Sequence, residues 1–256
     1  MSVKPPAVPS PAATVVLLRD RPGGGCETLL IRRHEKSRFA AGDFVFPGGR
    51  IEPGDTPDDP ARWCLGLDAA SAARRLGIEG DGALAFWVGA IREAFEEVGV
   101  LLACDAAGRP ARLAAADLAA RRRACQEDSR AFWALLRDER LVLPVGRLVY
   151  FAHWITPEER PLRFDTRFFA AEMPPGQDAE PDAHEITAVR WLTPAEALAA
   201  RARGEISLRT PTATNLGLID GAPSVAAALE RLQRLEVVTV RPRLVGGAGA
   251  ERPILG

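Results

Sequence analysis

The fold is decided by the stretch Arg92-Glu93-Ala94-Phe95-Glu96-Glu97-Val98-Gly99-Val100. On a helix, Glu93 precedes Glu96 and Glu97 by three and four positions, so the three carboxylates share one side. Like charges at this spacing cost an isolated helix about 0.2–0.5 kcal/mol for each pair, so they do not favour the helix by themselves. Hard cations such as Mg²⁺ prefer oxygen ligands, which the cluster supplies. Two interpretations fit this stretch alone. It is either a metal site or a solvated acidic face on which Glu97 is exposed.

A second informative segment lies upstream and reads Phe46-Pro47-Gly48-Gly49-Arg50-Ile51-Glu52-Pro53-Gly54-Asp55. It follows a short strand-like run, 43–46, which Pro47 is expected to stop. Two glycines at such a point allow the backbone to turn tightly and to approach a ligand closely. The joint occurrence of this segment and the acidic stretch is too specific to be treated as chance.

Together the two segments resemble the Nudix box, G-x5-E-x7-R-E-U-x-E-E-x-G-U, where U is aliphatic. Gly49 opens the box, and residues 92–100 match its second half at every position. The first glutamate of the pattern is replaced by Asp55, and the spacer that follows has 36 residues, 56–91, rather than seven. A loop insertion costs little because closure entropy grows only logarithmically with length. Because the glutamate is replaced and the spacer is long, the role of Asp55 is left open. The R-E-x-x-E-E core is expected to be intact.

Nudix enzymes hydrolyse nucleoside diphosphates linked to another moiety and use Mg²⁺ or Mn²⁺. The resemblance implies that Glu93 and Glu97 are the main metal ligands. Glu96 is expected to complete the cluster and to take part in catalysis, and the Gly48 carbonyl is an additional candidate ligand. Arg92 is assigned a catalytic role in which it orients the carboxylates.

The general base varies between branches of this family and is often a glutamate in a downstream loop. Glu180 and Glu185 are the available residues, and Glu185 is the one assigned here as catalytic. An ordinary surface position remains open for both.

The residues before the box resemble the coenzyme A signature L-L-T-x-R-[SA]-x3-R-x3-G-x3-F-P-G-G. Arg33, Arg38 and Gly42 fall in register with it, while positions 31 and 34 depart from it. The resemblance implies that Arg33 and Arg38 bind the 3′-phosphate and diphosphate of coenzyme A, with Gly42 and Gly49 also contacting substrate. Ordinary surface charge is the alternative for both arginines, because the chain is rich in arginine.

Two later runs, 153–157 and 163–169, add to this resemblance. With the long spacer inside the box, they are similar to the peroxisomal coenzyme A diphosphatases of animals and their bacterial relatives. The likeness extends over residues 13–220. It implies hydrolysis of coenzyme A or acyl-coenzyme A to 3′,5′-ADP and 4′-phosphopantetheine or its acyl form.

The order of the expected elements favours an α/β Nudix fold, a mixed β-sheet sandwiched between helices with helical insertions. Strands are expected over 14–18, 27–33, 43–46, 147–156, 163–173 and 185–192, with an edge strand within 237–245. Helices are expected over 59–76 and 84–98, twice within 111–140, and from the capping box at Thr193 and Glu196. Residues 13–245 are expected to form one domain between tails 1–12 and 246–256. The insertion 56–84 is expected to fold beside the active site, and 106–140 forms a second helical segment.

Composition supports a globular enzyme. The 256 residues have a formal net charge of −1, with 47% hydrophobic and 26% charged residues, values typical of folded globular proteins. The charge balance gives no reason to expect nucleic acid or membrane as a partner. Four cysteines without a C-x-x-C pair indicate a reducing compartment, so a cytoplasmic location is expected. The expected partner is a small-molecule nucleotide, and a homodimer is left open.

Two rival functions remain. The first is a Nudix hydrolase of ADP-ribose or another nucleotide sugar, with the same metal cluster and a different pocket. The second is a non-catalytic, nucleotide-binding Nudix regulator. Such a regulator is expected to lose part of the glutamate cluster, whereas Glu93, Glu96 and Glu97 are all present.

Overall fold

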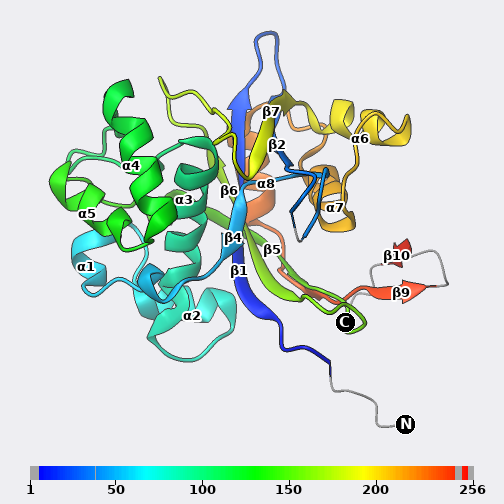
Figure 1. Cartoon of the computed structure of the whole chain (residues 1–256), viewed down its shortest axis with the longest axis horizontal. Helices are drawn as coiled ribbons and strands as arrows, with labels where there is room; N and C mark the ends of the chain where they lie inside the picture. The colour runs from blue at the N-terminus through cyan, green and yellow to red at the C-terminus, as the bar shows by residue number, and fades with distance from the viewer. Residues whose placement is uncertain (1–5, 38, 246–249, 253–256) are drawn as a thin grey trace.

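A computed structural model describes residues 6–37, 39–245 and 250–252 of the chain. Its centre is a mixed eight-stranded sheet with the order β3-β2-β1-β6-β5-β8, in which β4 also pairs with β1 and β7 with β2 (Figure 1). The strands are β1 (Ser10–Asp20), β2 (Cys26–Arg33), β3 (Phe44–Val45), β4 (Gly48–Arg50), β5 (Val149–Ile155), β6 (Phe164–Glu172), β7 (Ile186–Leu192) and β8 (Thr239–Val240). The central pair, β1 and β6, is parallel, whereas β1 and β2 are antiparallel.

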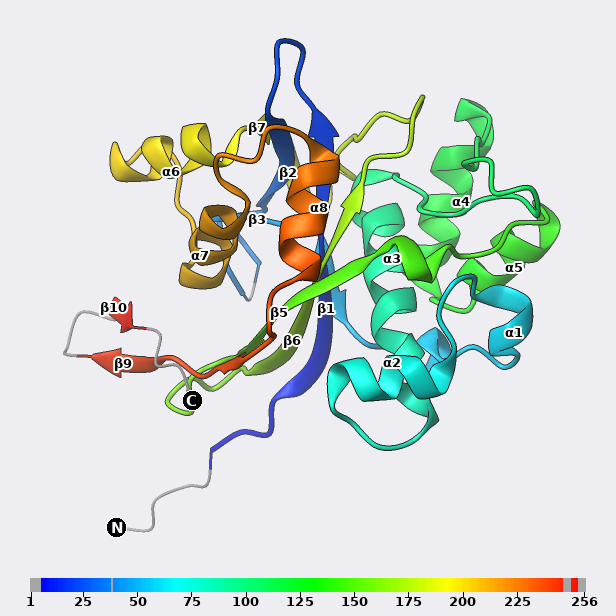
Figure 2. The same ribbon diagram turned by 180° about the vertical axis from the view of Figure 1, so that it is seen from behind.

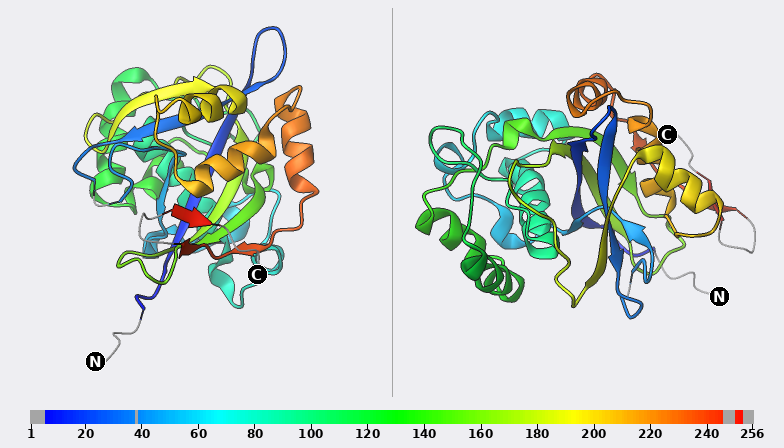
Figure 3. Two further views of the ribbon diagram at one scale, coloured as in Figure 1. Left: turned by 90° about the vertical axis from the view of Figure 1, so that its right-hand side faces the viewer. Right: turned by 90° about the horizontal axis from the view of Figure 1, so that it is seen from above.

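Helices cover both faces of this sheet, as the view from behind and the view from above show (Figures 2 and 3). One face carries α1 (Pro60–Trp63), α2 (Ala69–Leu76), α3 (Leu84–Val98), α4 (Ala115–Glu127) and α5 (Ala131–Asp138). The other carries α6 (Pro194–Ala202), α7 (Thr210–Ile219) and α8 (Val225–Gln233). The layered α/β architecture expected from the sequence is confirmed.

Each face has its own hydrophobic core, because alternate side chains of a strand point to opposite sides of the sheet. In β1, Ala13, Val15 and Leu17 join the core beneath α3, and Val16 and Leu18 join the core beneath α7 and α8. The helix α3 is therefore fixed to one side of β1 along most of its length.

The sheet forks beside β1. β1 pairs with β2 through residues 18–20 and with β4 through residues 12–14, so two strands share the same edge. Between these two stretches, Val15 N–H donates to the Pro47 carbonyl at 2.9 Å. The fork places Gly48 and Gly49 at the boundary between the two faces of the sheet.

Helix α3 has the bounds that the sequence predicted, 84–98. Thirteen of its fifteen residues are buried, including Arg92 and Glu97. It ends at Gly99, whose left-handed backbone (φ 72°) caps the helix by donating to the carbonyls of Ala94 and Phe95. Burial on nearly every side, rather than helix propensity, holds the acidic stretch in place.

Two strand predictions need correction. The first strand starts at Ser10, not Thr14, because residues 10–13 pair with β6 and partly with β4, so part of the expected 1–12 tail lies in the sheet. The two glycines at 48 and 49 do not form the predicted turn. They lie in β4, because pairing with β1 keeps their backbone extended.

The insertion 56–84 also differs from expectation. The single helix predicted over 59–76 is two helices, because Gly66 takes a left-handed backbone (φ 80°) and Asp68 caps a new start by accepting from Ser71 N–H. These helices pack near the amino-terminal end of α3, and none of their described residues lines the main cavity. The prediction that the insertion lies beside the active site is wrong.

The remaining element predictions are largely confirmed. α4 and α5 are the two helices within 111–140, and Thr193 and Glu196 form the predicted capping box. β8 is an edge strand, while β9 (Arg243–Val245) pairs with β10 (Ala250–Arg252) in a separate two-stranded sheet, so part of the expected C-terminal tail is a strand. Within the described ranges, no helix has the length and apolar character needed to cross a bilayer.

Candidate active site

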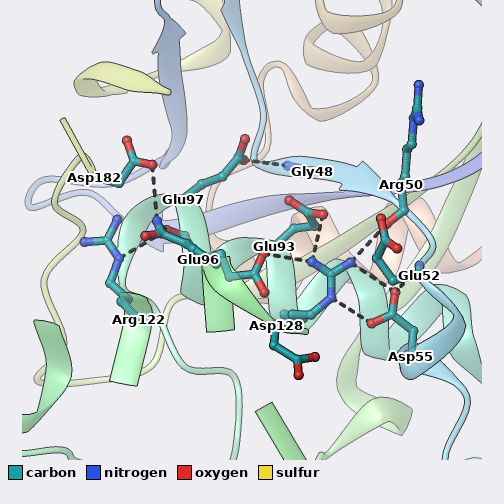
Figure 4. A network of polar contacts seen from close by, with 12 residues as sticks. Gly48, Arg50, Glu52, Asp55, Glu93, Glu96, Glu97, Arg122, Asp128 and Asp182 are labelled. Atoms are coloured by element: carbon teal, nitrogen blue, oxygen red, sulfur yellow. Dashed lines mark hydrogen bonds and ion pairs between the residues drawn. The ribbon is translucent and has the colours of Figure 1, made fainter. Parts of the chain in front are cut away.

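Arg92 organises the acidic residues of α3. The residue is 2% exposed, and its guanidinium donates to both carboxylate oxygens of Asp55, through Nε at 2.7 Å and Nη2 at 3.0 Å. Nη1 donates to Glu93 Oε1 at 2.9 Å and to Glu96 Oε2 at 2.8 Å, and Nη2 also reaches the Arg50 carbonyl (Figure 4). The predicted role of Arg92 as the residue that orients carboxylates agrees with these contacts.

The backbone of β4 lies directly against Glu93. A Cβ built on Gly49 would lie 2.4 Å from Glu93 Oε1, closer than real Cβ contacts, so a side chain there would displace the Glu93 carboxylate. At Gly48, a Cβ would lie 2.5 Å from the Ala13 carbonyl. The close approach that the sequence predicted is therefore real, but it is an approach to a carboxylate and to β1.

Glu97 is buried, with 5% of the residue exposed, so the expected exposed carboxylate is wrong. Its Oε2 accepts the Gly48 N–H at 2.9 Å, and its Oε1 accepts from Arg33 Nη1 at 3.3 Å. Arg33 Nη2 also lies 3.6 Å from Glu185 Oε2. Arg33 thus joins the end of α3 to the loop before β7.

Burial and mutual repulsion shift the titration of the cluster. Burial raises the pKa of Glu96 to about 8, Arg92 opposes the shift, and Glu93 adds to it. Burial raises the pKa of Glu93 while Arg92 lowers it, and burial with the Glu93 charge raises the pKa of Glu97 well above its usual range. In the absence of a bound cation, burial therefore disfavours the charged form of these carboxylates.

The donor set fits a hard divalent cation in its chemistry. Glu96 Oε1 is buried and has no hydrogen-bond partner, so one carboxylate oxygen is left without compensation. Among the described residues, however, no three Asp, Glu, His or Cys side chains already converge as a ready-made metal site. Glu93 and Glu96 turn towards Arg92, and Glu97 towards Gly48. Glu93 gives only Oε1 to Arg92, and Glu96 gives only Oε2.

The loop before β7 is held by Asp182, which the sequence analysis did not single out. Its Oδ1 accepts from three successive backbone N–H groups, those of residues 184–186, at 2.8–3.0 Å. Its Oδ2 accepts from Gln126 Nε2 at 3.2 Å, and the same amide donates to the Glu96 carbonyl at 2.8 Å. Ala183 has a left-handed backbone (φ 66°) within this turn. The only sequence signal for this arrangement was a short polar side chain four positions before the start of a strand.

A cavity of about 1050 Å³ joins these residues to the other face of the sheet. Its acidic end is lined by Glu93, Glu96, Glu97 and Glu185. Beyond β4 it continues along the α7 face, where the lining is aromatic: Phe39, Phe46, Trp154, Phe164 and Phe168. An elongated ligand with a charged centre and an extended second half fits this shape.

Comparison with known proteins then places the chain. Residues 70–218, more than half of it, match the family model of the NUDT19 Nudix domain. The chain belongs to this Nudix family. A solved Nudix hydrolase from Alicyclobacillus acidocaldarius is 28% identical and superposes with a TM-score of 0.75, covering 90% of this chain and 99% of that one.

Two curated relatives are named acyl-coenzyme A diphosphatase NUDT19. The Gallus gallus protein is 32% identical over 247 residues, which cover 78% of this chain and 65% of the relative. The Homo sapiens protein is 28% identical over 225 residues, covering 75% of this chain and 60% of the relative. The chain thus spans slightly less than two thirds of the length of these relatives.

Within the Nudix box, the structure settles the position of Asp55. Despite the long spacer, Asp55 is only 1% exposed, and both of its carboxylate oxygens accept hydrogen bonds from Arg92. Oδ2 also accepts the Glu52 N–H at 2.8 Å, which closes a short 3-10 turn. Gly89 provides the space, because a Cβ there would lie 3.0 Å from Asp55 Oδ2. Asp55 is therefore a partner of the Nudix arginine.

The remaining predicted site residues are divided. Glu185 lines the cavity, whereas Glu180 is not among its described lining residues and its N–H instead donates to the Val98 carbonyl. Gly42 lies in the turn between β2 and β3 (φ 71°), packed against Glu35; it is not among the described lining residues, and its N–H donates to the Arg33 carbonyl at 3.2 Å. Its role in substrate binding stays a prediction. Arg38 lies outside the described residues.

Proposed function

We propose that this Nudix protein hydrolyses the diphosphate linkage of coenzyme A or acyl-coenzyme A, releasing 3′,5′-ADP and 4′-phosphopantetheine or its acyl form. The observation that supports it most is the carboxylate cluster organised by Arg92, which opens into a long cavity with an aromatic second half. The coenzyme A signature around Arg33 and the names of the curated relatives favour this substrate over other nucleoside diphosphates.

Glu93, Glu96 and Glu97, with the Gly48 carbonyl, are the residues that would hold Mg²⁺ or Mn²⁺. The cation would neutralise the diphosphate and lower the pKa of a water molecule. Arg92 fixes Glu93 and Glu96 through Nη1, so the two carboxylates keep a defined orientation. A bound cation would also favour the charged form of these glutamates, whose pKa values burial raises.

Glu185 is our candidate for the general base. It lines the cavity, its side chain is 68% exposed, and the Asp182 turn fixes its backbone. Water attacks one phosphorus of the diphosphate, its proton passes to Glu185, and the bond from that phosphorus to the bridging oxygen breaks. The other phosphate leaves with the bridging oxygen. Arg33, which joins Glu97 to Glu185, lies where it can contact the diphosphate.

The test is analysis of products by mass spectrometry. The protein is incubated with Mg²⁺ or Mn²⁺ and, separately, coenzyme A, acetyl-coenzyme A, ADP-ribose and a dinucleotide polyphosphate. We expect 3′,5′-ADP and the matching phosphopantetheine from the first two. Brisk cleavage of ADP-ribose with no cleavage of coenzyme A would instead assign the nucleotide-sugar function. Nucleotide binding without any cleavage would assign the regulator.

We further propose that the enzyme works in a reducing compartment such as the cytoplasm. All four cysteines, Cys26, Cys64, Cys104 and Cys125, are free and buried, as expected for structural thiols under such conditions. A small-molecule nucleotide as the partner follows from the proposed activity, and a homodimer remains open to measurement of the solution mass.

A further inference from the structure

The far end of the cavity carries an aromatic pair flanked by guanidinium groups. Phe39 and Phe164 meet edge to face, with ring centroids 5.0 Å apart. The Arg209 guanidinium lies 4.5 Å from the centroid of Phe39, and that of Arg50 lies 5.7 Å from the centroid of Phe164. All four residues line the cavity, and they come from four separate segments of the chain.

The arginines Arg92, Arg33, Arg209 and Arg50 all line the cavity, but they differ in whether an acidic side chain pairs with them. Arg92 binds three carboxylates, and Arg33 pairs with Glu97 and Glu185. Arg209 donates from Nε to Asp43 Oδ2 at 2.9 Å, so its charge is also compensated. Arg50 is exposed and forms no ion pair with any described residue. Figure 4 shows its side chain directed away from the carboxylate cluster.

The backbone of Arg50 lies close to where the diphosphate of the substrate would bind. It directly follows Gly49, which lies against Glu93, so its backbone is adjacent to the site where the linkage would be cleaved. Its side chain extends from there to Phe164. In coenzyme A, the ribose places a 3′-phosphate and an adenine one sugar away from the diphosphate. The pantetheine half carries no charge, so it would offer the Arg50 guanidinium no anionic partner.

Building on the proposed function, we propose that Arg50 binds the 3′-phosphate of the substrate and that Phe164 contacts the adenine beside it. The arm of the cavity on the α7 face would then hold the 3′-phosphoadenosine half. A guanidinium is suited to a phosphate because it presents paired donors in a plane. This assignment moves recognition of the 3′-phosphate from Arg33, whose guanidinium faces two glutamates, to Arg50.

The test compares binding of two product nucleotides that differ only in the 3′-phosphate, 3′,5′-ADP and 5′-AMP, by calorimetry without added metal. We expect Arg50→Met to weaken 3′,5′-ADP binding about ten- to a hundredfold, the range for a charge-assisted hydrogen bond. Binding of 5′-AMP should change less than about threefold. Arg50→Lys should retain part of the preference, because it keeps the charge but not the fork.

Arg190→Met is the matched control, because Arg190 is also exposed and lies over a phenylalanine, Phe44, but does not line the cavity. It should leave the affinity for both nucleotides unchanged. An equal loss of both nucleotides in Arg50→Met, or no loss of either, would overturn the assignment.

The same variant is then assayed for kcat/KM on coenzyme A and dephospho-coenzyme A. A loss confined to coenzyme A supports the assignment. If the wild type cleaves neither compound but Arg50→Met still abolishes the preference for 3′,5′-ADP, the proposed function fails and the 3′-phosphate site stands. If the wild type cleaves coenzyme A and Arg50→Met loses both substrates equally, the site fails and the function stands.

Discussion

Replacing Asp55 by Asn is expected to destabilise the protein strongly, because it removes the charge from a buried ion pair. Asp55 and Arg92 are 1% and 2% exposed, and two hydrogen bonds join them. Breaking such a pair costs about 3–5 kcal/mol. Arg92 keeps Glu93, Glu96 and the Arg50 carbonyl as partners, so we place the loss near the lower limit, about 3 kcal/mol.

The assay is thermal unfolding followed by circular dichroism, with urea unfolding as a second measure. For a chain of this size, 1 kcal/mol corresponds to about 2–4 °C in Tm, so Asp55→Asn should lower Tm by about 6–12 °C. Asp138→Asn is the matched control, because Asp138 pairs with Arg121 at 2.8 Å on the surface. An exposed pair contributes about 0–1 kcal/mol.

The same substitution should reduce kcat more than it changes KM, because Arg92 also holds Glu93 and Glu96. A Tm loss in Asp55→Asn no larger than that in Asp138→Asn would refute the reasoning. It would mean that the long spacer leaves Asp55 unimportant for the Nudix arginine.

Three further predictions follow from the site. Because burial raises the folded-state pKa of Glu96 to about 8, above the usual value of 4.5, the metal-free protein should lose stability as pH rises from about 4.5 to 8. Added Mg²⁺ should reduce that loss of stability. Urea unfolding at pH 6 and pH 8, with and without metal, measures the free energy of unfolding. Equal stability at both pH values without metal would contradict the prediction. Gly49→Ala should reduce kcat at least about tenfold by pushing Glu93 aside, whereas Gly217→Ala, which meets nothing within 4 Å, should not; equal activity of the two variants would exclude the close approach. Asp182→Ala should lower kcat about tenfold with little change in KM, because three backbone N–H groups of the turn that carries the proposed base lose their acceptor; steady-state kinetics measures the split, and a change in KM alone would remove the positioning role.

The Nudix helix was predictable because its information is local. The spacing of Glu93, Glu96 and Glu97 and the glycine at position 99 fix a helix face and a helix end within one short stretch. The capping box at Thr193 was predictable for the same reason. In each case, residues within a few positions of each other carry the pattern from which the element can be predicted, although tertiary packing holds α3 in place.

Other features depend on partners distant in the sequence. The burial of Glu97 depends on Gly48 and Arg33, which are 49 and 64 positions away. Asp55 meets Arg92 across 37 positions. Gly48 and Gly49 form a strand because β1 lies alongside them, whereas their local propensity favours a turn. Such contacts follow from the topology of the sheet, which no short stretch of sequence contains.

The most direct test of the central claim is the rate at which 3′,5′-ADP is released from coenzyme A with Mg²⁺ or Mn²⁺ present, in the wild type and in Glu97→Gln. Glutamine preserves the shape of the side chain and an acceptor for the Gly48 N–H, but it removes the charge that a cation requires. The account predicts metal-dependent release by the wild type and a loss of about a hundredfold or more in the variant. Wild-type release without added metal in the presence of a chelator, or an unchanged rate in Glu97→Gln, would contradict it.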